Sequence, residues 1–316
     1  MTVTWTSGYD IGESTPFVEW GIKGDRKMAE CDGSNEYSDY QPGSLNTTDQ
    51  LVRDLNNIDI VFHIGDLTYS NGYLSQWDQF TAQVEPIAST VPYMIGRFVH
   101  LHVNHCHVIL LSFYDTPDSG GECGVPAETM FYVPAENRAK FWYSTDYGMF
   151  RFCIADSEHD WREGSEQYRF IEQCLASVDR RKQPWLIFAA HRVLGYSSDY
   201  WYAQEGSFAE PMGRESLQKL WQKYKVDIAF YGHVHNYERT CPIYQNQCAN
   251  EEKHHYSVLD YDFGFVKMTA FNHSYMPYEY KKSRDGEVYD SFTISRDYKD
   301  VLACVQDGCE TTTLAT

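Results

Sequence analysis

Three short apolar runs in this sequence each end at side chains that can bind a metal ion. The runs are residues 58–64, 185–190 and 226–230. The side chains that follow them are Asp66, Tyr69, His191, His233 and His235. Short apolar runs bounded by turn residues predict buried strands. Because functional groups of α/β sheets gather at the carboxyl ends of strands, we expect these side chains to converge if the strands share a sheet.

The segment Gly232-His233-Val234-His235 is the strongest single signal. Two histidines at positions i and i+2, in a short loop past a strand, can direct both imidazoles into one pocket. Neutral imidazole is a good ligand for zinc, iron and other transition metals. Taken alone, the pair is also compatible with two unrelated surface histidines. Its interpretation therefore depends on the residues that follow the other two runs.

The five side chains together have the composition of a dinuclear metal site. A carboxylate that bridges two cations, with imidazoles on each, is an ordinary way to hold such a pair. The phenol of tyrosine has an unperturbed pKa of about 10, and trivalent iron can deprotonate it at low pH where zinc would do so poorly. Asp66 or Tyr69 alone is compatible with an ordinary turn residue. All five together at strand ends indicate a metal site, in which a tyrosine ligand would suit trivalent iron better than zinc.

The order of helices and strands predicts an α/β fold. Helices are expected at residues 44–57, 77–89, 165–178 and 213–225. Further strands are expected at residues 91–95, 141–154 (a hairpin that turns at 146–148), 263–271 and 287–294. Ser44 or Asn46 is the expected cap of the first helix, with Leu45 on its inner face. This alternation indicates a layered α/β domain.

The formal net charge of −19 over 316 residues disfavours several kinds of partner. It argues against nucleic-acid binding and against an anionic membrane surface. It also disfavours an anionic substrate unless a metal ion supplies local positive charge. No run approaches the roughly 18 apolar residues of a membrane span. The segment Met1–Trp5 has no basic start and no apolar core, so no secretory signal is predicted in this chain.

The nine cysteines are an odd number, so at least one is unpaired within the chain. Short separations make two local disulfides plausible: Cys241–Cys248 and Cys304–Cys309. No CxxC pair is present, so a structural zinc knuckle is not expected. Glycosylation sequons begin at Asn46 and Asn272, and they matter only if the protein is secreted.

On these residues the chain resembles the purple acid phosphatases, specifically the large plant type of this calcineurin-like metallophosphoesterase family. Gly65-Asp66-Leu67-Thr68-Tyr69 matches the family's GDxxY, His191 its VxxH-type histidine, and Gly232–His235 its GHxH. The resemblance implies a four-layer sandwich of two mixed β-sheets flanked by helices. It also implies an acid phosphatase that hydrolyses small phosphate monoesters with iron(III) and a divalent metal, namely zinc, manganese or iron.

The resemblance further implies a role for each of the five residues. Asp66 would bridge the two metals. Tyr69 and His235 would bind iron, and His191 and His233 would bind the divalent ion. Because the family is typically secreted, a location outside the cell, in the cell wall or in the vacuole is expected.

The sequence departs from the family pattern at two other metal motifs. The first motif, GDxG, corresponds to Gly24-Asp25-Arg26-Lys27, where a lysine replaces the last glycine. Asp25 is the iron ligand expected there. The motif GNH(D/E) should follow residue 95, but only Val103-Asn104-His105-Cys106 is similar to it. Asn104 would then bind the divalent ion, and His105 would face the phosphate as a catalytic residue.

The departures also affect the expected domain organisation. Residues 1–24 are expected to be a remnant of an N-terminal fibronectin-like β-domain, residues 25–256 the catalytic domain, and residues 257–316 its C-terminal strands and tail. The catalytic domain is interrupted around residues 96–111, where four histidines suggest either a zinc site or a strand with a histidine-rich polar face. Around residues 257–259, strands expected from the family are missing. These discontinuities suggest that the sequence is an alternatively spliced product or comes from a faulty gene model.

Two other functions are compatible with the same residues. A phosphodiesterase or nucleotide pyrophosphatase would use the same two metals, because nothing in the sequence fixes the leaving group. A non-catalytic remnant is the other reading. Missing ligands would leave the divalent site under-coordinated, and even changes around a metal's ligands reduce affinity or activity substantially.

Overall fold

The computed structural model describes residues 43–70, 74–96, 124–199, 201, 213–244, 247–248 and 256–299, within a compact unit that spans residues 41–316. The predicted α/β class is confirmed, because helices alternate with parallel strands in a mixed sheet. The β-domain remnant expected at residues 1–24 lies outside the described residues, as do Asp25, Asn104 and His105.

The described helices are α1 (Ser44–Arg53), η1 (Leu55–Asn57), α2 (Leu74–Ala88), α3 (Val125–Met130), η2 (Arg138–Lys140), α4 (Glu166–Ala176) and α5 (Arg214–Tyr224). The first strands are β1 (Val61–Ile64), β2 (Tyr93–Gly96), β3 (Tyr143–Tyr147), β4 (Phe150–Ile154), β5 (Trp185–Ala189) and β6 (Ile228–Phe230). The later strands are β7 (Tyr237–Thr240), β8 (Ile243–Tyr244), β9 (Gln247–Cys248), β10 (Tyr256–Asp260), β11 (Gly264–Met268), β12 (Tyr275–Lys282) and β13 (Val288–Ser295).

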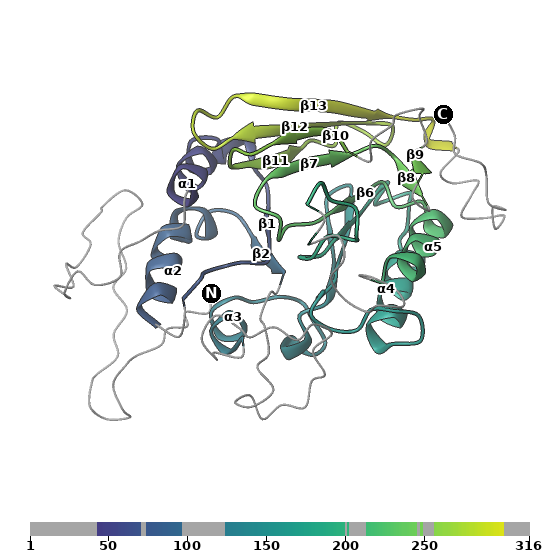
Figure 1. Ribbon diagram of the computed structural model, residues 1–316, viewed down its shortest axis with the longest axis horizontal. Coiled ribbons are helices and arrows are strands. Elements are labelled where there is room, and N and C mark those ends of the chain that lie inside the picture. The colour runs from purple at the N-terminus through teal and green to yellow at the C-terminus, as the bar shows by residue number, and fades with distance from the viewer. Residues whose placement is uncertain are drawn as a thin grey trace. The chain divides into compact units, whose positions relative to one another are not determined.

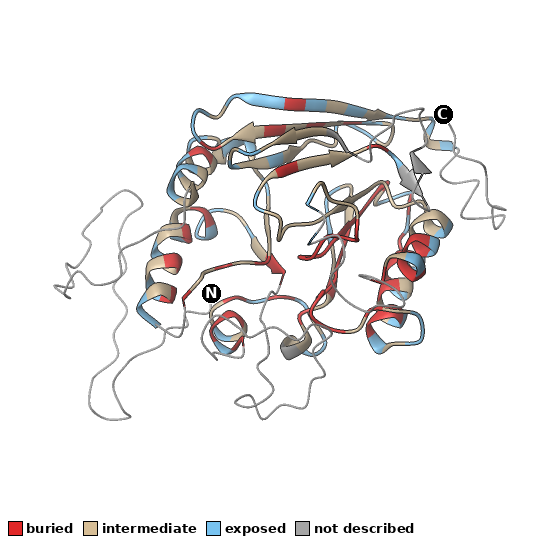
Figure 2. Ribbon diagram, in the orientation of Figure 1, coloured by how far each residue is buried: buried red, intermediate tan, exposed pale blue. Residues whose placement is uncertain are grey.

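The largest sheet among the described residues has four strands in the order β3-β4-β5-β6. Helices α4 and α5, which pack on this sheet, lie side by side (Figure 1). Strands β4, β5 and β6 are parallel, and β3 pairs antiparallel with β4. All five residues of β5 are buried (Figure 2). Continuous burial is typical of a parallel strand covered on both faces. The sheet therefore brings the carboxyl ends of β4, β5 and β6 to one edge.

A separate hydrophobic cluster covers each face of this sheet. On one face, Leu186 and Phe188 of β5 pack with Ile171 and Leu175 of α4 and with residues of α5. On the other face, the alternate β5 residue Ile187 packs with residues of α2 and of the parallel pair β1-β2. Successive strand residues point to opposite faces. The apolar runs that predicted these strands thus supply both clusters.

The later strands form further small sheets, and tyrosines connect them to the strand that follows the GHxH segment. Tyr237 in β7 stacks on Tyr280 in β12 with ring centroids 3.9 Å apart. The Tyr237 hydroxyl donates a hydrogen bond of 2.7 Å to Asp290 in β13. Strands β11, β12 and β13 form an antiparallel sheet, and β7 pairs with β10. The end of the GHxH loop is therefore fixed on the C-terminal strands.

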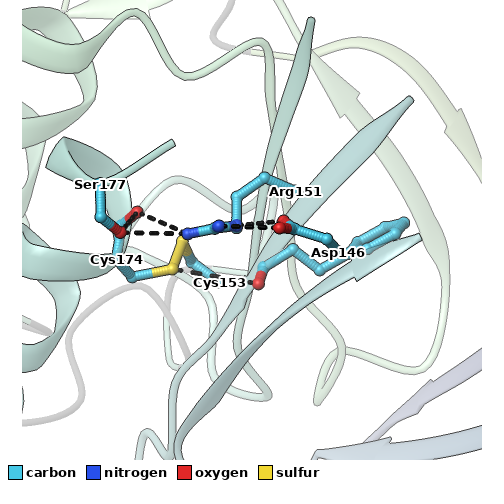
Figure 3. Close-up of a disulfide and its surroundings, with 6 residues drawn as sticks. Asp146, Arg151, Cys153, Cys174 and Ser177 are labelled. Carbon is cyan, nitrogen blue, oxygen red and sulfur yellow. Dashed lines mark hydrogen bonds and ion pairs between the residues drawn. A yellow bond between two sulfur atoms is a disulfide. The ribbon is translucent and has the colours of Figure 1, made fainter. Parts of the chain in front are cut away.

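A buried disulfide joins Cys153 of β4 to Cys174 of α4 (Figure 3). Arg151, two residues earlier on β4, pairs with Asp146 of β3 and donates to the Ser177 hydroxyl at 3.1 Å. The sequence did not predict this pairing. Cys241 is also disulfide-bonded; the predicted Cys241–Cys248 bond stays a prediction, and Cys304–Cys309 lies outside the described residues.

The first helix begins at Ser44 as predicted, but its predicted N-cap, Ser44 or Asn46, is wrong. Its N-cap is Gly43, with φ of 76°, and no side chain caps the helix. Leu45 is exposed instead of facing inward. A β-carbon on Gly43 would lie 2.5 Å from the Phe263 ring, so a tertiary contact and a left-handed backbone both favour glycine here. No helix among the described residues has the length and apolar character that a bilayer span requires.

Candidate metal centre

The ends of three strands bring the candidate ligands together. His191 lies two residues past β5 and His233 three residues past β6, while Asp66 lies two residues past β1. The Gly232 amide donates to the His191 carbonyl at 2.8 Å, which joins the ends of β5 and β6. The His191 Nδ1 atom lies 3.1 Å from the Ile64 carbonyl at the end of β1. The side chains converge as predicted, but the strands do not share one sheet, because β1 pairs with β2 in a separate two-stranded sheet.

The carboxylate of Asp66 occupies the middle of the group. Its Oδ2 atom accepts the Tyr69 hydroxyl at 2.6 Å and lies 3.6 Å from His235 Nε2. Its Oδ1 atom lies 3.5 Å from His191 Nε2. The two oxygens of one carboxylate thus face two different sets of side chains.

The side chains on each side of the Asp66 carboxylate also contact each other. The Tyr69 hydroxyl is 2.9 Å from His235 Nε2. On the other side, His191 Nε2 is 3.1 Å from His233 Nδ1. Possible ligand atoms of Asp66, His191 and His233 all lie within 4.8 Å of one another. Such spacing between lone-pair atoms is short enough for one cation to contact all three.

Left-handed backbone conformations place these groups. Asp66 has φ of 47° and His233 has φ of 69°, which is uncommon for residues other than glycine. Gly65 has φ of 108°, and a β-carbon there would lie 2.1 Å from His191 Nδ1. Backbone strain of this kind clusters at functional sites. The glycine before Asp66 is needed for the close approach of the His191 ring.

Family comparisons agree with this geometry. The calcineurin-like phosphoesterase family matches residues 24–237, and the family described as iron/zinc purple acid phosphatase-like protein C matches residues 237–291. The chain belongs to the purple acid phosphatase family. It is 68% identical to "Probable inactive purple acid phosphatase 24" of Arabidopsis thaliana, over all of this chain and 70% of that protein.

Two further relatives differ in name and in coverage. The chain is 62% identical to a "Nucleotide pyrophosphatase/phosphodiesterase" of Hordeum vulgare, over 93% of this chain and 87% of that protein. It is 65% identical to the solved purple acid phosphatase PPD1 from yellow lupin (Lupinus luteus) seeds, with a TM-score of 0.79 over 92% of this chain. The chain spans 55% of that solved chain. The purple acid phosphatase fold expected from the sequence is thereby confirmed.

The protonation states of the site suit cation binding. Burial alone would raise the pKa of Asp66, but the neighbouring His191 and hydrogen bonds from His235 and Tyr69 hold that pKa below its usual range. Burial lowers the pKa of His191 to about 3, so its imidazole is neutral. The hydrogen bond with Asp66 raises the pKa of His235. An ionised carboxylate beside a neutral, buried imidazole is the form that ligates metals.

The residues fit the two metals of a purple acid phosphatase. The Ile64 carbonyl can only accept, so His191 carries its hydrogen on Nδ1 and directs the lone pair of Nε2 at Asp66. Carboxylate, phenol and imidazole donors suit iron and zinc. Dinuclear metal binding is therefore chemically reasonable for this set.

The sequence reasoning missed two residues beside the site. Arg192 directly follows His191, and its guanidinium lies 3.2 Å from His233 Nε2. Glu158 follows β4 and pairs with Arg192 at 2.7 Å. The strand-end rule that selected Asp66 and His191 would also have selected Glu158, because it lies four residues past the predicted hairpin strand that ends at Ile154.

Proposed function

We propose that the protein hydrolyses phosphate esters, with phosphate monoesters as the leading substrate class, at a dinuclear site for iron(III) and a divalent metal. The observation that carries the proposal is the position of Asp66, whose Oδ2 atom faces Tyr69 and His235 and whose Oδ1 atom faces His191. A bridging carboxylate needs such a division. When bound, two cations would neutralise the charge of a phosphate group and activate water for attack on phosphorus.

The chain's own residues divide between the two cations in this proposal. Tyr69 and His235 would hold iron(III), and His191 and His233 would hold zinc, manganese or iron(II). Asp25, Asn104 and His105 are proposed as a further iron ligand, a further divalent ligand and the histidine that faces the phosphate. The local positive charge would offset the net charge of −19 for an anionic substrate.

A second candidate is hydrolysis of phosphodiesters or nucleotide pyrophosphates. The barley relative of that name is 62% identical over nearly its whole length, which favours this reading. The two reactions use the same metals and differ in the leaving group. Turnover of p-nitrophenyl phosphate and bis-p-nitrophenyl phosphate, measured side by side on one preparation, separates them. A higher kcat/KM for the diester would overturn the monoester proposal.

The non-catalytic reading also has support from the relatives. Four Arabidopsis relatives are named "Probable inactive" purple acid phosphatases. The alignment with one of them has 432 positions against 316 residues in this chain, so 116 positions have no counterpart here. Elemental analysis of the purified protein decides the matter, because two metals per chain support the enzyme, whereas one or none supports a remnant.

Replacing Tyr69 with phenylalanine is expected to remove the visible absorption band of an iron tyrosinate and to lower p-nitrophenyl phosphate turnover. The ring is retained, but the oxygen that donates to Asp66 at 2.6 Å is lost. Tyr143→Phe is the matched control, because the Tyr143 hydroxyl is buried and donates to the Ile95 carbonyl. The iron-loaded control should keep the band. Loss of the band in Tyr143→Phe, or its retention in Tyr69→Phe, would contradict the assignment.

We also propose that the protein is exported to the cell wall, the extracellular space or the vacuole. The disulfide between Cys153 and Cys174 supports this, because disulfides persist mainly in oxidising compartments. Asn272 of the second sequon is exposed in the loop before β12. Peptide mapping of protein isolated from plant tissue without reduction should recover the Cys153 and Cys174 peptides as one linked species. Recovery of both peptides with free thiols would argue against export.

A further inference from the structure

A glycosylation sequon lies in the turn between two strands of the C-terminal sheet. Asn272-His273-Ser274 falls between β11 and β12, which pair antiparallel. The Phe271 amide donates to the Tyr275 carbonyl at 3.1 Å and closes the turn around these three residues. The side chain of Asn272 is exposed. The hairpin therefore presents the acceptor asparagine at the surface of the protein.

Contacts with distant segments fix the backbone of this turn. The buried Trp185 at the start of β5 donates from Nε1 to the Asn272 carbonyl at 2.9 Å. The Arg296 amide, just past β13, donates to the Ser274 carbonyl at 3.1 Å. Both carbonyls on either side of the sequon's middle residue are thus bound. The conformation of the turn is set by the tertiary structure.

The side chain of Asn272 contacts the turn through its oxygen and leaves its nitrogen for another bond. The Oδ1 atom accepts the Ser274 amide at 2.8 Å. This contact distinguishes oxygen from nitrogen, because a backbone amide can only donate. Among the residues that the structure describes, Nδ2 has no hydrogen-bond partner. Nδ2 is the atom that carries an N-linked glycan.

Two exposed aromatic rings flank the sequon. Phe271 is 65% exposed and Tyr275 is 44% exposed. Their ring centroids lie 6.0 Å apart, with an angle of 47° between the planes. Single exposed apolar residues are common in folded proteins. Here, however, two neighbouring rings bracket an acceptor asparagine, which indicates what could cover them.

The first sugar of an N-linked glycan suits an aromatic surface. N-acetylglucosamine directs ring C–H groups to its two faces, and such groups pack on aromatic faces, where the electron density is high. The sugar would be joined directly to Asn272, so it would lie next to the side chains that adjoin this residue. Its contact with the rings would remove apolar surface from water.

We propose that Asn272 carries an N-linked glycan and that Phe271 and Tyr275 form the surface on which its first N-acetylglucosamine packs. A transferase of the secretory pathway would supply the sugar from a lipid-diphosphate-linked oligosaccharide. The bond between Asn272 Nδ2 and sugar C1 forms, and the bond from C1 to the phosphate oxygen breaks. The amide loses one proton, and the lipid diphosphate leaves. The proposal rests on the export proposed above and is independent of the metal site.

Peptide mapping of the full chain, secreted from plant leaf cells with an added signal peptide, tests the acceptor. Peptide-N-glycosidase in H₂¹⁸O converts a glycosylated asparagine into ¹⁸O-labelled aspartate. The wild-type Asn272 peptide should carry the label. An unlabelled Asn272 peptide would overturn the proposal. A label in the secreted protein but not in native protein from plant tissue would support the acceptor and count against export.

A double-mutant cycle on thermal unfolding tests the packing. Because Phe271 is largely exposed, Phe271→Ala should fold. It should lower Tm by about 2 °C more in the glycosylated protein than in Asn272→Gln, since only the glycosylated protein loses the sugar contact. Trimming the glycan to its first sugar with an endoglycosidase should preserve this difference. Equal losses in the two backgrounds would overturn the packing.

Asn46→Gln is the matched control. Asn46 begins the other Asn-x-Ser/Thr sequon and is also exposed, but it lies within α1. In this variant the Asn272 peptide should stay labelled, and Phe271→Ala should lower Tm as much as it does in wild-type protein. A smaller loss in Asn46→Gln would indicate a general effect of glycans on stability and would overturn the packing on Phe271.

Discussion

Replacing Asp66 with asparagine is expected to abolish dinuclear metal binding and phosphate ester hydrolysis. The substitution keeps the size of the side chain and tolerates φ of 47°, since asparagine, like aspartate, is enriched at positive φ. It removes the negative charge and one acceptor oxygen of Asp66. Among the five predicted ligands that the structure describes, Asp66 is the only carboxylate. A directly bound group should matter more than an outer partner, so we expect metal affinity to fall by more than about 100-fold.

Elemental analysis and p-nitrophenyl phosphate turnover measure this outcome. Asp54→Asn is the matched control, because Asp54 is equally enclosed (18% against 17% exposed) and its ion-pair partners, Lys267 at 2.7 Å and Lys281, are not among the proposed ligands. The control should retain its metals while losing those ion pairs. Two metals per chain in Asp66→Asn would refute the bridging role.

Replacing Gly65 with alanine is expected to disrupt both the fold and the metal site. The new methyl group would lie 2.1 Å from Nδ1 and 2.5 Å from Cγ of His191. His191 is buried and cannot swing into solvent. A non-glycine residue in a sparsely populated backbone region costs about 1–3 kcal/mol by itself. Displacing the ring adds to this, so we expect a loss of more than about 3 kcal/mol in the free energy of unfolding.

Urea unfolding and zinc titration measure the two effects separately. Gly164→Ala is the control, because Gly164 has φ of 88° and nothing lies within 4 Å of the position of its β-carbon. It should show the backbone cost alone, with zinc affinity unchanged. Equal destabilisation in the two variants would mean that contact with His191 is unimportant. In that case a clash with the His191 ring would not be the reason that residue 65 is a glycine.

Sequence patterns predicted the helices that bury one face and the strands that are buried on both faces. Ile171 and Leu175 of α4 and Leu217 of α5 are buried as the helical periodicity predicts. Strand β12 was missed, although Tyr278 and Tyr280 point inward. Its alternation mixes tyrosine with lysine and glutamate, and tyrosine occurs both inside and outside proteins. Only the pairing with β11 and β13 gives this stretch its buried face.

Contacts between distant segments explain the remaining differences. Gly43, and neither Ser44 nor Asn46, is the N-cap of α1, and Phe263, directly before β11, fills the space that a β-carbon at this position would need. Cys153 pairs with Cys174 because packing of α4 on the sheet brings the two together across 21 residues of sequence. Short separation in sequence would favour disulfides between other cysteines, such as Cys304 and Cys309.

For the candidate site, the sequence by itself determined which side chains lie at the strand ends, because apolar runs bounded by turns specify where buried strands stop. It thereby identified five potential ligands, and the motifs that contain them gave the resemblance to the family. The tertiary structure decided how these ligands are divided, with Tyr69 and His235 on one oxygen of Asp66 and His191 on the other. It also brought Glu158 and Arg192 to His233. Such contacts join the ends of separate strands, and their geometry is set by sheet order and packing, which strand-end positions in the sequence do not encode.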